Sequence, residues 1–276
     1  MKCKYSKNRS DKEKFKHISD NDKNALELLH LQLIFIYIYM MSDVFLFIGT
    51  IESINICYGK KEDNNPILLL EQGQILALIA NIINNYITST RYSQLSERYN
   101  EEEISLEPEF LVKQASILSI ILYSLNVIAV SKQYEASLVI NIFKCDKNSI
   151  NLLFLQAVCF LMRFYGDYFL LRSTLKSIDL IRSKYDKSIK KIYNPDIDAV
   201  IAAEFYVLQR GVLYDIGCIA LVTLINNGTE LEKELLLPAQ QTLVIANIIG
   251  VIANITVLIA FIKIYNRNEN EPIFGR

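Results

Sequence analysis

Hydrophobic positions fall into six long runs separated by short polar segments. The last run, residues 235–262, contains no ionisable side chain in 28 consecutive positions. As a helix it would be about 42 Å long, against a bilayer hydrocarbon core of roughly 30 Å. The pattern predicts an all-α fold, a helical membrane bundle, with apolar helices over residues 27–57, 66–90, 108–131, 150–171, 197–225 and 238–264.

Polar segments flank this predicted bundle, which covers residues 24–266. Residues 1–23 form an arm with eight Lys or Arg and four acidic residues, and residues 267–276 form a short tail. The arm lacks the apolar core of a cleavable signal, so we expect it in the mature protein. Residues 173–193 place apolar side chains three or four positions apart between Lys and Arg residues, which predicts a basic amphipathic helix. This helix either lies in the headgroup layer, with Lys176–Lys191 and the arm contacting anionic lipids, or covers a soluble bundle.

Two of the apolar helices resemble each other in sequence. Residues 65–86 align without gaps with residues 107–128, with seven identities that include Pro66 and Pro108. Residues 245–254 join the alignment more weakly. We therefore predict an internal repeat, a duplicated helix with proline in its first turn, where the missing N–H costs no hydrogen bond.

The repeated helices share small residues four positions apart and uncharged polar residues seven positions apart. In lipid, small residues let helix backbones approach closely, and amide side chains join helices by hydrogen bonds. The amides are interpreted as interhelical contacts, with the lining of a ligand path as the alternative. The predicted packing residues are Gly73, Ala77, Ala115, Ser119, Ala246 and Gly250, with the amide residues Gln74, Asn81, Asn247 and Asn254.

Charged residues inside the fourth and fifth helices are the candidate functional site. A charge within a membrane span is costly and must face the bundle interior or a partner. Structural pairing and the lining of a ligand path both remain open as roles. The candidates are Arg163, Asp167, Glu204, Arg210 and Asp215.

Catalytic and metal-binding patterns are absent from the sequence. The chain has two histidines; Glu27 and His30 form one Glu-x-x-His pair, and no second pair completes a metal ligand set. The five cysteines have no ligand spacing, and no Gly-rich phosphate loop occurs. We therefore expect no cofactor and no metal, and the net charge of −1 gives no reason to expect a nucleic-acid partner.

Lys and Arg are distributed unevenly between the two predicted ends of the bundle. The end that holds both termini carries 20 of them outside the helices, and the opposite end carries 6. The positive-inside rule then places both termini in the cytoplasm and the helices in the cell membrane. The Ile, Asn and Lys content indicates a low-GC, bacterial genome. The leading hypothesis is a non-enzymatic integral membrane protein that could form a homo-oligomer. A transport or pore component and a soluble or amphitropic helical interaction protein are the alternatives.

Overall fold

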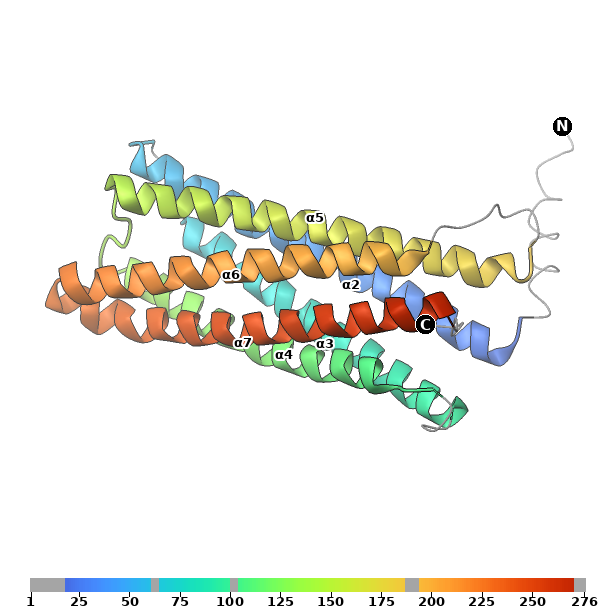
Figure 1. Cartoon of the computed structure of the whole chain (residues 1–276). Helices are drawn as coiled ribbons and strands as arrows, with labels where there is room; N and C mark the ends of the chain where they lie inside the picture. The colour runs from blue at the N-terminus through green and yellow to red at the C-terminus, as the bar shows by residue number, and fades with distance from the viewer. Residues whose placement is uncertain (1–17, 61–64, 100–103, 187–193, 271–276) are drawn as a thin grey trace, which may run out of the picture.

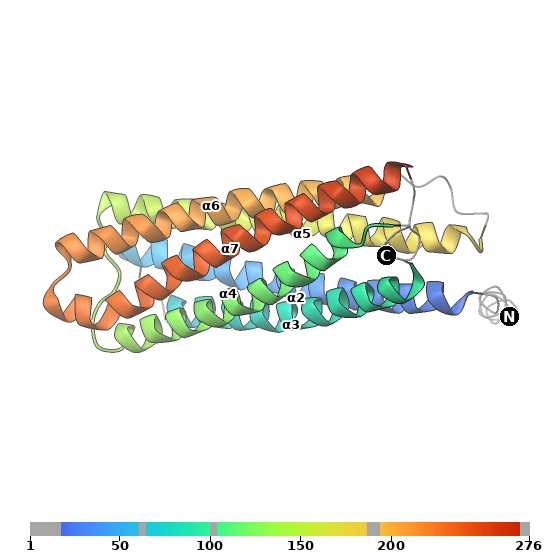
Figure 2. The same cartoon turned by 60° about the horizontal axis from the view of Figure 1, so that its bottom comes forward.

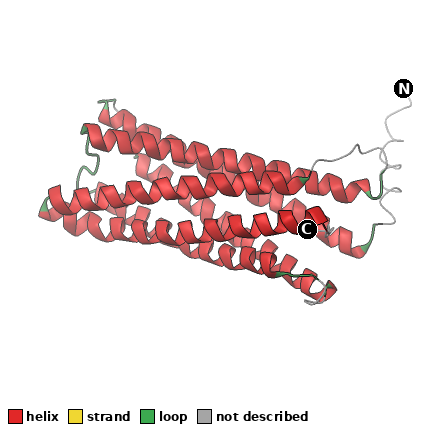
Figure 3. Cartoon of the chain, viewed as in Figure 1, coloured by secondary structure: helices red, strands yellow, loops and turns green. Residues whose placement is uncertain are grey.

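The chain folds into long helices. The computed structural model describes residues 18–60, 65–99, 104–186 and 194–270, and within these ranges it contains six helices and no strand (Figure 3). The predicted all-α fold is confirmed. The helices, labelled as in Figure 1, are α2 (Asp20–Cys57), α3 (Pro66–Arg98), α4 (Glu107–Ser137), α5 (Lys147–Ser183), α6 (Pro195–Asn227) and α7 (Glu230–Asn270).

Several helix starts are fixed by capping side chains. Asn65 and Asn194 each accept a hydrogen bond from the backbone two residues ahead, at 3.0 and 2.9 Å, and proline follows each of them. The last helix begins at Glu230, and not at Pro238 where the sequence analysis placed its start. The reason is a capping box in which Thr229 and Glu232 satisfy each other's backbone N–H groups.

The basic amphipathic helix expected over residues 173–193 is not a separate element. Instead, α5 continues without interruption through Ser183, because no proline or glycine stands between residues 171 and 183. Residues 187–193 and the arm up to residue 17 lie outside the described residues. Two of the basic side chains in this region pair with neighbouring helices, Lys176 with Asp198 at 2.6 Å and Lys184 with Asp22 at 2.9 Å.

The six helices form a closed ring in the order α2, α3, α4, α7, α6, α5. Each described helix contacts two neighbours, and α5 closes the ring against α2. Successive helices run in opposite directions, so the start of α2 and the end of α7 lie at the same end of the bundle (Figures 1 and 2). We name this the terminal end. The α2–α3, α4–α5 and α6–α7 connections lie at the other, the far end.

The bundle carries apolar side chains on its outside and charged ones at its centre. Ile82 and Ile245 are both 53% exposed, whereas Arg163 and Asp167 are 2% and 1% exposed. All six helices are also long and apolar enough to cross a membrane. This distribution is the reverse of the usual one in water-soluble proteins, where ionised side chains are almost never fully buried unless paired.

Helices α2 and α3 pack closely where α3 has a glycine. A Cβ atom on Gly73 would lie 2.7 Å from Cγ of Leu46 and 3.2 Å from the carbonyl oxygen of Ser42. In contrast, a Cβ atom on Gly211 of α6 would meet no atom within 4 Å. A side chain at position 73 would therefore clash with α2, whereas one at position 211 would change only the intrinsic helix stability.

We predict that Gly73→Ala lowers the thermal unfolding temperature of the detergent-solubilised protein. Overpacking of this kind costs about 1–3 kcal/mol. Gly211→Ala, the matched control, should keep or raise the unfolding temperature, since alanine favours a helix over glycine by about 1 kcal/mol. Equal shifts for both variants would show that the contact with Leu46 is not tight.

Candidate functional site

Two buried arginines meet at one tyrosine in the middle of the bundle. The Tyr123 hydroxyl on α4 accepts hydrogen bonds from Arg163 Nη1 on α5 and Arg210 Nη2 on α6, each at 3.0 Å. It is also hydrogen-bonded to the hydroxyl of Tyr39 on α2. The exposed fractions of the two arginines are 2% and 3%. Two permanent positive charges are thus held away from the bundle surface.

Arg163 has a charged partner of its own. Its Nε group forms an ion pair with Asp43 on α2, and its Nη2 donates to the Ser42 hydroxyl at 2.9 Å. The guanidinium also lies over the Tyr39 ring, 4.3 Å from the ring centroid, in cation–π geometry. Because Ser42 and Asp43 follow Tyr39 by three and four positions, α2 presents all of them on one face.

Asp167, one turn after Arg163 on α5, is held by α6. The Tyr206 hydroxyl donates to its Oδ1 at 2.5 Å. Gly166 makes this contact possible, because a Cβ atom there would lie 2.7 Å from the Tyr206 ring. Asp167 also interacts with Asp43 of α2, so the two carboxyl groups belong to one buried cluster.

Arg210 differs from Arg163 because it forms no ion pair with any described residue. Its hydrogen bonds go to neutral oxygens, the Tyr123 hydroxyl and Oδ1 of Asn247 on α7, the latter at 3.1 Å. Gly250 makes room for it, since a Cβ atom there would lie 2.7 Å from Cδ of Arg210. Nε of Arg210 has no acceptor within the described ranges. No described carboxylate is therefore in direct contact with Arg210, and its guanidinium carbon lies 5.6 Å from the centroid of the Tyr123 ring.

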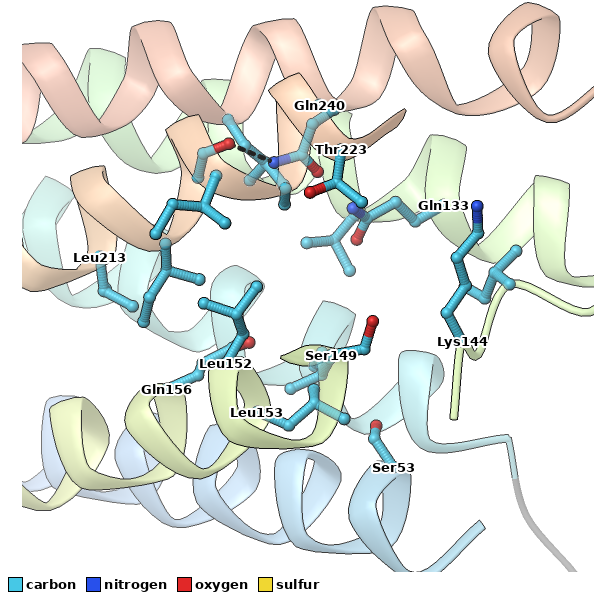
Figure 4. Close-up of a pocket in the computed structure, with 18 of the residues that line it drawn as sticks. Ser53, Gln133, Lys144, Ser149, Leu152, Leu153, Gln156, Leu213, Thr223 and Gln240 are labelled. Atoms are coloured by element: carbon cyan, nitrogen blue, oxygen red, sulfur yellow. Dashed lines mark hydrogen bonds between the residues drawn. The ribbon is translucent and has the colours of Figure 1, made fainter. Parts of the chain in front are cut away.

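A cavity of about 710 Å³ extends from the far end of the bundle to these arginines. Lys144, Asp146 and Asn227 line it at the far end, and Arg163 and Arg210 line its inner end. Neither Asp43 nor Asp167 is part of the wall. Between the two ends, most polar side chains in the wall are uncharged, as Figure 4 shows for part of it. These residues are Ser53, Gln74, Asn126, Gln133, Asn148, Ser149, Asn151, Gln156, Thr223, Gln240 and Asn247.

Apolar side chains close the bundle on the terminal side of the arginines. Leu28, Phe35, Ile87 and Leu170 belong to one buried cluster that also contains Tyr39 and Tyr123. On each helix these residues lie nearer the terminal end than the cavity residues do. We name these four residues the apolar plug. The cavity therefore extends from the far end only as far as the arginines, and the apolar plug lies between its inner end and the terminal end.

The amide residues of α7 join it to α6. Gln240, Asn247 and Asn254 donate to the carbonyl oxygens of Gly217, Leu213 and Tyr206, at 3.0, 3.1 and 2.9 Å. Gln74 accepts from Asn126 across the α3–α4 contact at 3.1 Å, whereas Asn81 donates to Ala77 of its own helix. Gln240, Asn247 and Gln74 also line the cavity. These three amides therefore both form contacts between helices and line the cavity, so the two roles considered from the sequence do not exclude each other.

The predicted charged residues divide between the inside and the outside of the bundle. Arg163, Asp167 and Arg210 are buried, as described above, while Glu204 and Asp215 are exposed and form no ion pair with a described residue. At about 100° per residue, six positions separate Glu204 from Arg210 by roughly 240°, and five separate Asp215 from it by roughly 140°. The carboxylates of Glu204 and Asp215 therefore do not join the central cluster.

The predicted small residues occupy several kinds of position. Ala77, Ala115 and Ala246 are fully buried, and Gly73 lies against α2. The Ser119 hydroxyl donates to Ala115 of its own helix. The internal repeat and the homo-oligomer stay predictions.

Sequence reasoning did not assign Asp43, Tyr39, Tyr123 or Tyr206 to the site. Asp43 had a visible signal, since it interrupts the first apolar run. The tyrosines had none, because single tyrosines within apolar helices are equally compatible with a lipid-facing position. Within the described residues, no group of three or more His, Cys, Asp or Glu side chains could hold a metal ion.

The chain matches no protein-family model, no curated protein and no solved structure.

We predict that Asp43 and Arg163 are energetically coupled. Asp43→Asn leaves the Arg163 charge without its partner, and Arg163→Met leaves the carboxylate without its own. Removing one partner of a buried ion pair costs about 3–5 kcal/mol. The double variant should be destabilised by clearly less than the sum of the two single variants in thermal unfolding.

Glu204→Gln is the control for this cycle. It also removes an acidic charge, but from an exposed side chain without a described partner, so the unfolding temperature should hardly change. Strict additivity of Asp43→Asn and Arg163→Met would contradict the pairing.

Proposed function

We propose that this protein is an integral membrane protein that binds a small anionic solute in its far-end cavity and carries it across the membrane. Of the sequence hypotheses, this one combines the leading membrane assignment with the transport alternative. The observation that carries it is the position of Arg210, an arginine without a carboxylate partner at the inner end of a polar cavity.

The membrane assignment is supported by where the apolar surface lies. Large apolar side chains are exposed along all six helices, including Ile34, Ile79, Ile128, Val158, Val222 and Ile259, each more than 40% exposed. A monomer in water would expose a far larger apolar surface than soluble monomers do. A surrounding bilayer removes this cost, and the closed ring leaves the polar side chains facing one another.

The preference for an anion follows from the charges that reach the cavity wall. Both guanidinium groups reach it, while the two buried carboxylates lie outside it. Arg163 is paired with Asp43, and Asp167 is not part of the wall, so the positive charge in the wall at the inner end that has no described ion-pair partner is that of Arg210. A guanidinium binds a carboxylate or phosphate group through two parallel hydrogen bonds. The solute class is therefore a small carboxylate or phosphate anion.

Transport rather than binding alone is supported by the position of the site. The two arginines lie in the middle of the helices, between the cavity and the apolar plug. Passage to the terminal end requires the plug to separate, while the cavity side closes, as in alternating access around a central site. The excess of Lys and Arg at the terminal end favours a cytoplasmic terminal end and a cavity that opens to the outside. Contact of Lys176–Lys191 with anionic lipids stays a prediction.

We predict that a thiol in the cavity reacts preferentially with anionic reagents. Gln156→Cys, in a background without native cysteines, places a thiol in the wall two turns from Arg163. A negatively charged methanethiosulfonate should modify it faster than a positively charged one, relative to a free thiol. The charge of Arg210 should change the reaction rate of each reagent by a factor on the order of 10, at roughly 10 Å and an effective dielectric constant of about 20. The factor raises the rate of the negative reagent and lowers that of the positive one.

Arg210 and the neighbouring outward position provide the controls for this measurement. Arg210→Gln should abolish the preference and Arg210→Lys should retain it. Leu155 precedes Gln156 on α5 and is exposed on the outside of the bundle. Leu155→Cys should react slowly with both reagents, because the proposed bilayer surrounds this position. A preference that persists in Arg210→Gln would remove the basis of the anion proposal.

We also predict anion uptake into proteoliposomes that contain the purified protein. Labelled acetate, lactate, phosphate and sulfate are the probes, and uptake of at least one of them should be lost in Arg210→Gln. Glu204→Gln should leave the uptake unchanged, because this side chain is outside the cavity. Release of the protein from cell membranes by alkaline extraction, or uptake of cations alone, would contradict the proposed function.

A further inference from the structure

Two cysteines far apart in the sequence lie together at the entrance of the cavity. Cys57 is the last residue of α2, and Cys145 belongs to the connection between α4 and α5, 88 positions later. Their sulfur atoms are 2.6 Å apart, which is within about 0.6 Å of the roughly 2.05 Å length of a disulfide bond. Cys145 is exposed and Cys57 is partly exposed, so an external oxidant can reach the pair.

The α4–α5 connection is fixed on both sides of Cys145. Before it, Ile142 and Phe143 line the cavity and pack against the buried cluster of Leu46 and Phe160. After it, Asp146 caps α5 by accepting from the backbone of Asn148 and Ser149. The hydrogen bond from the Ser149 side chain holds the pKa of Asp146 below its usual value.

A further contact ties the same connection to α7. Lys144 forms an ion pair with Glu232 at 3.4 Å. The segment that carries Cys145 is therefore positioned by contacts with the buried cluster, α5 and α7. The approach of Cys145 to Cys57 follows from these contacts and does not depend on the cysteines alone.

We propose that Cys57 and Cys145 form a disulfide bond that joins α2 to the α4–α5 connection at the cavity entrance. The two thiols lose two protons and two electrons as the S–S bond forms. A disulfide-carrying oxidoreductase outside the cytoplasm takes the electrons and is reduced to its dithiol form. Such bonds persist in oxidising compartments, so the proposal also places the far end of the bundle outside the cytoplasm.

The disulfide restrains one wall of the cavity. Ser53, one turn before Cys57, and Phe143 and Lys144, just before Cys145, all line it. The bond closes a loop that contains the whole of α3 and α4, and cross-links that close long loops restrict the unfolded chain most. Two other described cysteines, Cys159 and Cys218, lie within α5 and α6 and have no such partner.

The test is the redox state of the pair in the cell. A variant with Cys3, Cys159 and Cys218 replaced by alanine retains only Cys57 and Cys145. Cells are quenched with acid, and the protein is denatured and treated with polyethylene-glycol maleimide, with and without prior reduction. We expect no mass addition without reductant and two additions after reduction. Cys57→Ser in the same background should show one addition in both conditions.

Two additions without reductant would overturn the proposal. This holds even if the pair closes when a chemical oxidant is added to membranes, because the far end would then face a reducing compartment in the cell. A second measurement supports the structural role: reductant should lower the unfolding temperature of the protein that contains the pair, and leave that of a Cys57→Ser and Cys145→Ser double variant unchanged. Neither measurement depends on the identity of the solute.

Discussion

The structure depends on how two guanidinium groups are accommodated in the middle of an apolar bundle. Arginine does not lose its charge in proteins, so Arg163 and Arg210 must find partners away from bulk water. Arg163 has a carboxylate and a stacked tyrosine ring, whereas Arg210 has a hydroxyl, an amide oxygen and the more distant Tyr123 ring, and no described carboxylate in contact. Three helices, α2, α4 and α7, supply these partners to arginines that lie on α5 and α6. The ring of helices is therefore required to bring the charges and their partners together.

Some of the amide side chains both hold helices together and face the cavity. Gln240 and Asn247 donate to backbone oxygens of α6, which fixes α7 beside it, and both also face the cavity. Amides are suited to both tasks because each side chain has donors and an acceptor and carries no charge. Asn247 uses its donors for α6 and its acceptor for Arg210. Its position thus couples the α6–α7 contact to the orientation of the guanidinium.

The number of helices and their approximate positions along the chain could be predicted from the sequence, because each span requires a long apolar run, whereas their order around the ring could not. Helix ends were less predictable, since polar residues extend α3 to Arg98 and α5 to Ser183 beyond the apolar core. The site was predicted in part: Arg163, Asp167 and Arg210 drew attention as charges in apolar helices. Their partners were not, because the contact between α2 and α5 joins helices that are distant in the chain. Helical spacing could have separated Arg210 from Glu204 and Asp215, but not shown which face is inward.

Three features of the far end bear on which side of the membrane it would face. This end carries few Lys and Arg in its connections, it contains the entrance of the cavity, and it brings Cys57 and Cys145 together. The first depends on the electrostatics of membrane insertion, the second on side-chain packing within the ring, and the third on the fold of the α4–α5 connection. Because these causes are separate, the redox state of the cysteine pair is an independent measure of the direction in which the cavity opens. A cavity that opens to the outside would receive its solute from the medium. The apolar plug would then be the barrier that separates the bound anion from the cytoplasm.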